Sequence, residues 1–362
     1  MKKKTIIHFI YSLQRGGAEV MLVRVLKELP EYRNIVVELY GDNVFGKELQ
    51  CDEYISLDVK SNLSLPLAIF KLRKIIKISN ADLVHSHLFW PTIIARLATP
   101  RQIPLLTTIH TAVSMAVDYK IRHVRLIDRL TYRFRKNTII AVSKSTLNEY
   151  AGFIKQKMSK SYLLYTFVDA DLFKKTSASP EKRADKFRMV SVGALREGKN
   201  FEYLIKSMSN CKATNIELHI YGEGVQHKLL QTMIDKFDVP VYLKGEITNL
   251  QDVLPQYDLY VSSSQFEGFS LSILEAMAVQ LPLLLSDIPS FREQCGDTAI
   301  YFDLKDENDF IVNLRFCIDN PGWTNTLSCR ALERVLDNYT LPIHTQSLKQ
   351  IYSESLDPAI SY

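Results

Sequence analysis

Short apolar runs alternate along the chain with longer segments in which apolar residues recur every three or four positions. In the first half, five such runs predict buried β-strands at residues 4–10, 34–40, 82–85, 104–109 and 138–142. In the second half, five more predict strands at residues 187–192, 217–221, 241–243, 258–262 and 283–285. Helical periodicity lies between the strands, notably at residues 17–29 and 65–78. Strands that alternate with helices indicate parallel sheets covered on both faces.

This order of elements predicts an α/β chain of two doubly wound, Rossmann-like domains. A chain of 362 residues is too long for one compact core of ordinary size, which favours two domains. Residues 171–185 are polar and carry no strand pattern, so we place the link there. The expected divisions are residues 1–175, 176–340 and a final segment, 341–362, with a helix at about 341–355. Ligands are expected in a cleft where the carboxyl ends of the strands face each other.

Charge divides the chain unevenly. Residues 1–180 contain 28 Lys+Arg and 15 Asp+Glu, which leaves 17 and 25 of the totals of 45 and 40 for the rest. A basic first half suggests an anionic partner: a phospholipid surface, a polyprenyl diphosphate or nucleic acid. The densest basic segment, residues 120–136, has the pattern of a basic amphipathic helix. We expect its apolar residues Ile121, Val124, Ile127, Leu130 and Phe134 to pack on the core.

The arginines and Asp128 of that segment are then expected in solvent, with the arginines available to anionic lipid. Nucleic acid is disfavoured, because no binding module or interleaved aromatic platform accompanies the patch. The amino terminus leads directly into a strand, and no apolar run is long enough to cross a membrane. We therefore expect a cytoplasmic protein, peripheral on the inner face of the membrane at most.

Neither cysteines nor histidines indicate a metal or disulfide site. The five cysteines are scattered without paired spacing, so we expect reduced, mostly buried thiols. We place His85 and His87 on opposite faces of a strand, where they would not chelate one ion. With no cluster of carboxylates to hold a diphosphate-bound cation, we expect no cofactor and metal-independent chemistry.

Residues 258–277 combine a buried strand, a turn at Gly268, a helix start and two glutamates, Glu267 and Glu275. The helix would leave the amides of Phe269, Ser270 and Leu271 without helical partners, and with the helix dipole these form an anion site. We expect a diphosphate there, with Glu275 placed to accept hydrogen bonds from an attached ribose. The alternative is an ordinary strand-to-helix turn with both glutamates solvated.

This segment resembles the glutamate pair of the retaining family 4 glycosyltransferases, or group 1 glycosyl transferases, although Ser270 stands at the usual glycine and Gln280 where a glycine often precedes the next strand. The resemblance implies the GT-B fold, with an acceptor-binding first domain, a donor-binding second domain and a final helix that returns to the first. It also implies that Glu267 lies by the donor sugar and that Glu275 binds the ribose.

Other segments extend the resemblance. Gly16 and Gly17 in the first strand-to-helix loop match a Gly-Gly-Ala-Glu segment that faces donor phosphates and acceptor. His110 matches a histidine that contacts the donor sugar. Further positions match a strand-to-helix loop and a glycine-rich turn near the nucleotide base, as follows: Gly193, Lys199, Gly222 and Glu223.

The family's arginine in that loop is replaced here by Ala194, and Arg196 is the candidate substitute. Lys199 and Arg196 would stabilise the departing diphosphate. We expect a retaining transferase that moves a sugar from a UDP- or GDP-sugar to a hydroxyl of a glycan or polyprenyl-diphosphate-linked acceptor, as in bacterial surface polysaccharide synthesis. Glu267 could instead act as a nucleophile. A nucleotide-sugar epimerase and a non-catalytic glycan-binding or scaffold protein remain alternatives.

Overall fold

The computed structural model describes residues 2–14, 16–41, 43–61, 64–111, 113, 119, 121–174, 186–211 and 215–357. The chain divides into two compact units, each with its own sheet. The first comprises Met1–Thr166 together with Leu341–Tyr362, and the second comprises Phe167–Thr340. The last segment of the chain therefore belongs to the first unit.

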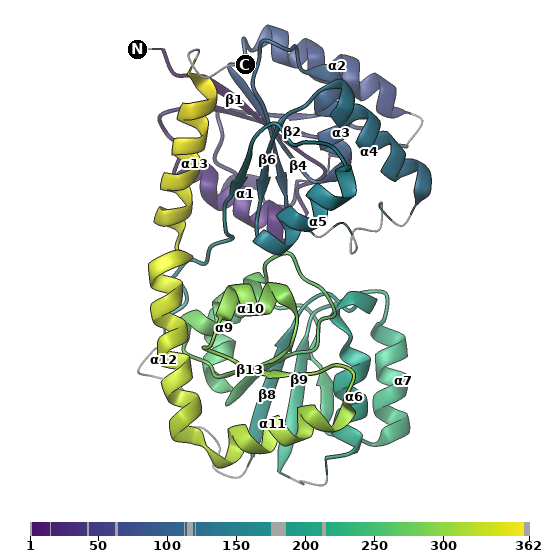
Figure 1. The fold of residues 1–362 in the computed structure, drawn as a ribbon, viewed down its shortest axis with the longest axis vertical. Helices are drawn as coiled ribbons and strands as arrows, with labels where there is room; N and C mark the ends of the chain where they lie inside the picture. The colour runs from purple at the N-terminus through teal and green to yellow at the C-terminus, as the bar shows by residue number, and fades with distance from the viewer. Residues whose placement is uncertain are drawn as a thin grey trace. The chain divides into compact units, whose positions relative to one another are not determined.

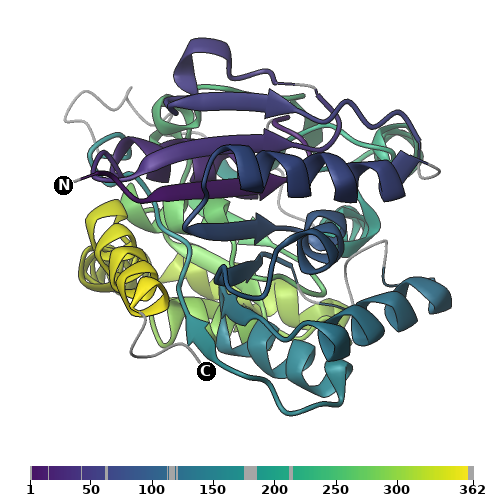
Figure 2. The ribbon, with the colours of Figure 1, turned by 90° about the horizontal axis from the view of Figure 1, so that it is seen from above.

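The first unit is built on a parallel sheet with the order β3-β2-β1-β4-β5-β6-β7. Its strands are β1 (Thr5–Ile10), β2 (Arg33–Glu38), β3 (Glu53–Ser56), β4 (Leu83–His87), β5 (Leu105–Ile109), β6 (Thr138–Ala141) and β7 (Ser161–Leu163). Its helices are α1 (Gly17–Lys27), η1 (Gly46–Glu48), α2 (Leu65–Ile78), α3 (Phe89–Ala98), α4 (Arg122–Phe134), α5 (Lys144–Ile154) and α13 (Leu341–Leu356). Helices α1 and α13 cover one face of this sheet, and α2, α3 and α4 lie on the other (Figures 1 and 2).

The second unit repeats the plan with a parallel sheet in the order β10-β9-β8-β11-β12-β13. Its strands are β8 (Phe187–Val192), β9 (Ile216–Tyr221), β10 (Val241–Leu243), β11 (Leu259–Ser262), β12 (Leu283–Ser286) and β13 (Ile300–Phe302). Its helices are η4 (Glu197–Lys199), α6 (Phe201–Ser209), α7 (His227–Phe237), α8 (Leu250–Val253), η5 (Leu254–Gln256), α9 (Leu271–Ala278), α10 (Pro289–Cys295), α11 (Glu307–Asp319) and α12 (Pro321–Asn338). Both sheets have buried, apolar inner strands, as the runs in the sequence predict.

All ten predicted strands and the final helix are confirmed, with ends within two residues of those expected. Three strands at or near sheet edges, β3, β7 and β13, were not predicted. The first unit ends at Thr166, nine residues before the expected division after 175, which itself lies outside the described residues. The shift arises because Val168 pairs with Thr340 and its amide donates to the Tyr339 carbonyl, at 2.9 Å, so the chain joins the second unit at once.

In helix α4, some side chains of the basic segment face the opposite way from the prediction. Lys120, the first residue of that segment, lies outside the described residues. Asp128 is buried, and its carboxylate forms an ion pair with the buried guanidinium of Arg96 on α3. Arg96 also donates to Asn137 Oδ1 at 2.9 Å and to the Tyr150 hydroxyl at 2.8 Å. The expectation that Asp128 is solvated is therefore wrong, because the α3–α4 contact needs a carboxylate to balance Arg96.

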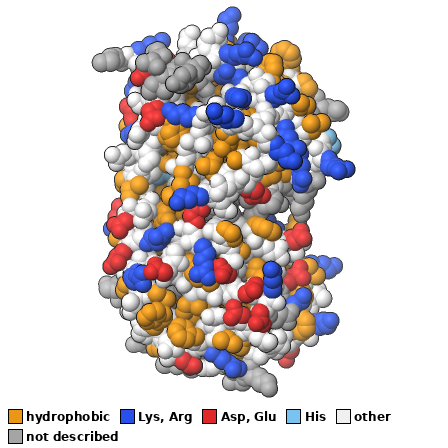
Figure 3. Space-filling view, in the orientation of Figure 1, with side chains coloured by type: hydrophobic (Ala, Val, Ile, Leu, Met, Phe, Trp, Pro, Cys, Tyr) orange, Lys and Arg blue, Asp and Glu red, His pale blue; other side chains and the backbone are white. Residues whose placement is uncertain are grey.

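The apolar stripe of α4 is also divided between core and solvent. Val124 is buried as expected, whereas Ile121, Leu130 and Phe134 are exposed, as is Leu126. Figure 3 shows Lys and Arg side chains interspersed with hydrophobic ones over the part of the molecule formed by the first unit. Among the described helices, none is both long and apolar enough to cross a bilayer. The five cysteines are free, with Cys295 and Cys317 buried and the other three half-buried.

Replacing Asp128 by Ala should destabilise the chain by about 3–5 kcal/mol, because it leaves the Arg96 charge buried without a counter-ion. Asp287→Ala is the matched control, since its ion pair with Arg292 is about half exposed and such pairs contribute at most about 1 kcal/mol. Urea denaturation measures both. Equal losses in the two variants would contradict a structural role for the buried pair.

Candidate active site

The second sheet changes winding direction between the neighbouring strands β8 and β11. From β8 the chain passes through α6 to β9 on one side, and from β11 it passes through α9 to β12 on the other. At such a point the loops after the two strands diverge and leave a crevice, where ligands of doubly wound sheets bind. The loop after β8 carries Lys199, and the loop after β11 carries Glu267.

These two side chains form a largely buried ion pair. Lys199 Nζ lies 2.6 Å from Glu267 Oε1, and the side chains are only 13% and 10% exposed. Ser264 donates its hydroxyl to the same carboxylate oxygen at 3.0 Å. The Ser263 hydroxyl donates to the carbonyls of Lys199 and Asn200, at 3.1 and 2.9 Å, and so fastens one loop to the other. The alternative of two solvated glutamates is therefore wrong for Glu267.

Gly193 makes room for this lysine. A Cβ at position 193 would lie 2.7 Å from Lys199 Cε and 3.0 Å from its Nζ, both closer than van der Waals contact allows. Gly222 is needed for a different reason. Its φ is +138°, and a Cβ there would lie 2.1 Å from the Gly193 carbonyl oxygen, so the two turns can approach this closely only with glycine at position 222.

Helix α9 begins at Leu271, two residues after the first amide, that of Phe269, that was predicted to bind an anion. Its N-cap is Ser270, and the first helical hydrogen bond runs from the Leu274 amide to the Ser270 carbonyl, at 3.2 Å. The amides that precede this bond in the first turn are those of Leu271, Ser272 and Ile273. Among the three amides predicted for phosphate, only that of Leu271 belongs to this set.

The Ser270 amide is already engaged. It donates to the buried side chain of Gln294, at 2.9 Å, and Gln294 Nε2 donates back to the Ser270 carbonyl, at 2.8 Å. The prediction of the Ser270 amide as an anion donor is therefore wrong, since a side chain from α10 occupies it. The Phe269 ring packs edge-on against Tyr339, with ring centroids 5.1 Å apart, which places that side chain in the core.

Glu275 is buried on α9, one helical turn beyond these amides. Burial and then the charges of Glu267 and Glu275 raise the pKa of Tyr260 on β11, so both carboxylates act on one buried phenol. The Tyr260 hydroxyl donates to Ser272 Oγ at 2.8 Å. Tyr260 therefore lies within electrostatic reach of both glutamates.

Two further candidates of the second unit lie in more open positions. Glu223 is exposed and pairs with His227 at 3.1 Å. Arg196 is exposed, and within the described part of the chain no ion pair joins its guanidinium to Glu267. Ala194, which stands at the family's arginine, is exposed beside it. The structure thus brings Lys199, but not Arg196, onto Glu267.

The first sheet changes winding direction between β1 and β4. Gly16 and Gly17 lie in the loop after β1, at the start of α1, and a Cβ on Gly17 would meet nothing within 4 Å. A Cβ on Gly16 would lie 2.4 Å from Glu19 Oε2, so the glycine admits this carboxyl. Burial raises the pKa of Glu19 to about 7, which leaves it protonated in part at neutral pH.

His110 follows β5 and lies between two cavities. On one side is a cavity of about 200 Å³ lined by aromatic and hydroxyl side chains, including Tyr11, Phe89 and Thr111. On the other, His110 Nε2 lies 3.2 Å from His87 Nδ1. Burial lowers the pKa of His110 to about 4, so its imidazole is neutral at pH 7.

The prediction that His85 and His87 face opposite sides of their strand is wrong. Residues two apart on a strand lie on one face. The ring centroids of His85 and His87 are 4.2 Å apart. Gln294 and Ser264 were not predicted as site residues. Ser264 lies within the motif and three residues before Glu267, which is a local signal, whereas Gln294 reaches the site from a separate helix.

Two family models match adjacent segments of the chain. Residues 15–172 match the model described as Glycosyltransferase Family 4, and residues 173–331 match Glycosyl transferases group 1. The chain belongs to the family 4, group 1 glycosyltransferases.

Relatives of this glycosyltransferase include a Campylobacter jejuni enzyme named N-acetylgalactosamine-N,N'-diacetylbacillosaminyl-diphospho-undecaprenol 4-alpha-N-acetylgalactosaminyltransferase. It is 25% identical over 95% of this chain and 98% of its own. The Escherichia coli O-antigen biosynthesis glycosyltransferase WclY is 22% identical over 87% of this chain and 89% of its own. Among solved structures, Anabaena Alr3699/HepE in complex with UDP and glucose superposes with a TM-score of 0.84, at 16% identity over 97% of this chain and 100% of that one. The GT-B fold is thereby confirmed.

In this glycosyltransferase, Gly193→Ala should push the Lys199 ammonium away from Glu267, because the flexible lysine gives way before the backbone does. We expect kcat to fall at least about tenfold while the Tm changes little. Gly152→Ala on α5 is the control, since a Cβ there meets nothing within 4 Å. Full activity of the Gly193 variant, or an equal loss in both, would contradict the assignment.

Proposed function

We propose that the chain is a retaining glycosyltransferase that takes a sugar from a nucleoside diphosphate sugar. The Lys199–Glu267 ion pair beside the opening of α9 is the observation that carries this proposal. A protonated lysine and a helix start together suit a diphosphate leaving group, because both stabilise the negative charge that grows as the glycosidic bond breaks. The Glu267 carboxylate holds the Lys199 ammonium in place, and each charge compensates the other in this partly buried site.

Each remaining candidate has a role in this proposal. The amides of Leu271, Ser272 and Ile273 bind phosphate oxygens, and Glu275 accepts hydrogen bonds from the ribose. A β-phosphate oxygen takes the proton of the acceptor hydroxyl, so no protein nucleophile is required. No divalent cation at the diphosphate is required either. A contact between His110 and the transferred sugar stays a prediction from the resemblance, as does a contribution of Arg196 to the diphosphate.

The names of relatives support a choice of donor class and acceptor. Alr3699/HepE is a UDP complex, and the Campylobacter relative is named for an N-acetylgalactosaminyl transfer onto a diphospho-undecaprenol-linked glycan. A UDP-sugar is therefore the first donor to test, with GDP-sugars as the comparison. A polyprenyl-diphosphate-linked glycan of a bacterial surface polysaccharide is the acceptor that we propose, with the reaction on the cytoplasmic side of the membrane.

Incubation with a panel of UDP- and GDP-sugars should release nucleotide slowly from one donor, measured by mass spectrometry. With a lipid-linked acceptor, NMR of the product should show an α linkage from an α-linked donor. Glu267→Gln should lower kcat by at least about a hundredfold, and the unaltered chain incubated with donor alone should carry no glycosyl adduct on Glu267. Glu333→Gln, an exposed change on α12, is the control. An epimerised sugar, or no turnover with any donor, would refute the proposal, and a trapped adduct would indicate double displacement.

We also propose that α4 contacts anionic lipid. Its solvent-facing side combines Leu126, Leu130 and Phe134, which are 55%, 54% and 63% exposed, with arginines. Two of these arginines also have internal contacts, since Arg129 donates to the Phe153 carbonyl and Arg125 to that of Tyr119. A face that alternates arginine with exposed apolar side chains suits the headgroup region of a bilayer, where each kind finds its own environment.

Arg122→Gln combined with Arg133→Gln should weaken binding to phosphatidylglycerol vesicles, measured by flotation, about thirtyfold, because about 1 kcal/mol of attraction is lost per charge near an anionic surface. Both arginines are exposed, so the fold should be unaffected. Lys228→Gln with Lys236→Gln on α7 removes the same charge from the second unit and should have little effect. Equal flotation with neutral and anionic vesicles, or none, would refute the lipid contact.

A further inference from the structure

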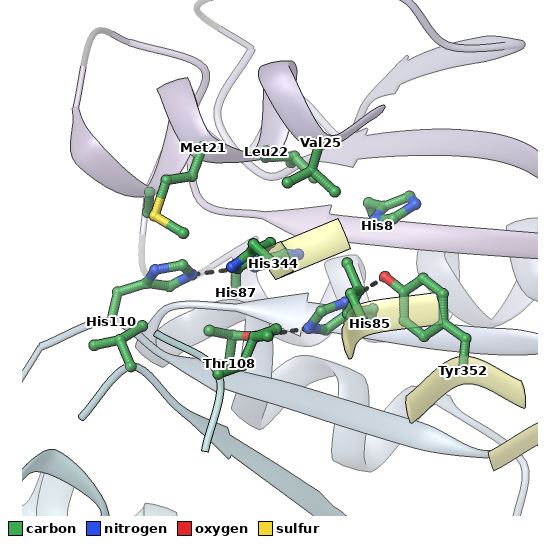
Figure 4. Close-up of a pocket in the computed structure, with 14 residues that line it drawn as sticks. His8, Met21, Leu22, Val25, His85, His87, Thr108, His110, His344 and Tyr352 are labelled. Carbon is green, nitrogen blue, oxygen red and sulfur yellow. Dashed lines mark hydrogen bonds between the residues drawn. The ribbon is translucent and has the colours of Figure 1, made fainter. Parts of the chain in front are cut away.

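Five histidines gather on the face of the first sheet that α1 and α13 cover (Figure 4). Three of them come from the neighbouring strands β1 and β4, where His8 and His85 are paired in register and His87 lies two residues further on. His8, His85 and His87 are 1%, 2% and 5% exposed. Each offers one ring nitrogen, and these three atoms lie within 4.8 Å of one another.

The ring of His8 is oriented by a partner that fixes its tautomer. His8 Nε2 lies 3.1 Å from Asn34 Oδ1. The Asn34 amide group is itself fixed, because its Nδ2 donates to the Leu29 carbonyl at 2.9 Å. Asn34 Oδ1 can therefore only accept, so His8 carries its proton on Nε2 and a lone pair on Nδ1. That Nδ1 is buried and has no hydrogen-bond partner among the described residues.

His87 shows the same arrangement with its nitrogens exchanged. Its Nδ1 contacts His110 Nε2, at 3.2 Å, while its Nε2 is buried without a partner in the described residues. Buried ring nitrogens are normally hydrogen-bonded, since an unsatisfied one costs about 1–3 kcal/mol. Two such atoms in one cluster indicate a ligand that satisfies both.

His85 has hydroxyl partners on both nitrogens. Its Nδ1 lies 2.7 Å from the Tyr352 hydroxyl, and its Nε2 lies 2.7 Å from Thr108 Oγ1. Rotation of the Thr108 side chain about χ1 would move its oxygen away and free Nε2 for an ion, while the Tyr352 hydroxyl accepts the proton on Nδ1. A hydrogen bond to the outer nitrogen is what a metal-bound histidine usually has.

The cavity beside these rings restricts what the ligand can be. Its volume is about 30 Å³, which is enough for an ion and a water molecule. The other lining groups are the histidines His110 and His344, hydroxyls, and apolar side chains that include Met21, Leu22 and Val25 from α1 (Figure 4). No carboxylate is among the lining residues that the structure describes, which disfavours Mg²⁺ and Ca²⁺. A set of imidazole nitrogens suits Zn²⁺, Co²⁺, Ni²⁺ or Cu²⁺.

We propose that His8, His85 and His87 bind one divalent transition-metal ion, Zn²⁺ in the first place, through His8 Nδ1, His87 Nε2 and one nitrogen of His85, with a water molecule as the fourth ligand. Coordination through Nε2 leaves His87 with its proton on Nδ1, which then donates to His110 Nε2. His110 in turn carries its own proton on Nδ1. The metal thus fixes the orientation and tautomer of a residue at the edge of the 200 Å³ cavity.

The test uses the full chain, purified without a histidine tag and treated with a chelator. Addition of Co²⁺ should give the visible absorption of a four-coordinate site at one ion per chain, and Zn²⁺ should displace it. Saturating Zn²⁺ should raise the Tm by about 5 °C, since the ligand binds the folded state alone. His87→Gln should abolish the absorption, whereas His123→Gln, an exposed change on α4, should leave it intact.

X-ray absorption at the zinc edge of the unaltered chain counts imidazole ligands and requires no variant to fold. About three histidines per zinc would support the site. Absence of stoichiometric Co²⁺ binding, a spectrum without imidazole, or binding that survives His87→Gln would each overturn it and leave an ordered water between the two nitrogens. None of these measurements needs a sugar donor, so the site can fail while the proposed transferase reaction stands, and the reverse.

Discussion

The second unit depends on one electrostatic constraint, which is that a lysine and a glutamate from different loops are held 2.6 Å apart with little solvent around them. Such a pair persists only where hydrogen bonds offset the desolvation of both charges. Here Ser264 supplies one to the carboxylate, and Ser263 holds the loop that carries the lysine. Gly193 supplies the space. The ion pair and the conformations of the loops after β8 and β11 therefore depend on each other.

Both sheets place their chemistry at the same topological point. In each, the chain leaves two neighbouring strands in opposite directions: β8 and β11 in the second unit, and β1 and β4 in the first. The switch point of a doubly wound sheet is where side chains from two loops can meet with no helix between them. The pair Lys199–Glu267 lies at one, and the rings of His8 and His85 lie at the other.

The sequence predicted the inner strands well because each is a short segment rich in apolar residues, and such segments have few alternatives in an α/β chain. It did not predict β3, whose residues Glu53–Ser56 are mostly exposed, because an exposed strand of four residues has no apolar pattern. In the site, Glu267 and Glu275 could be related because both lie in one short segment that joins the loop after β11 to α9. The partnership of Ser270 with Gln294 could not be predicted, because it joins two helices through a buried amide and leaves no periodic signal.

The error over His85 and His87 has a different origin, since the period of two residues along a strand already places them on one face. What the sequence could not supply is the third ring, because His8 joins them only through the parallel register of β1 with β4. The two switch points also differ in the charge of the side chains that they carry. In the second unit the charges lie on loops, where lysine and glutamate form an ion pair and Ser264 hydrogen-bonds to the carboxylate. In the first, the titratable groups lie on the strands themselves, where burial keeps the imidazoles neutral. Neutral nitrogen lone pairs suit a metal ion, whereas the ammonium and helix amides of the second unit suit an anion.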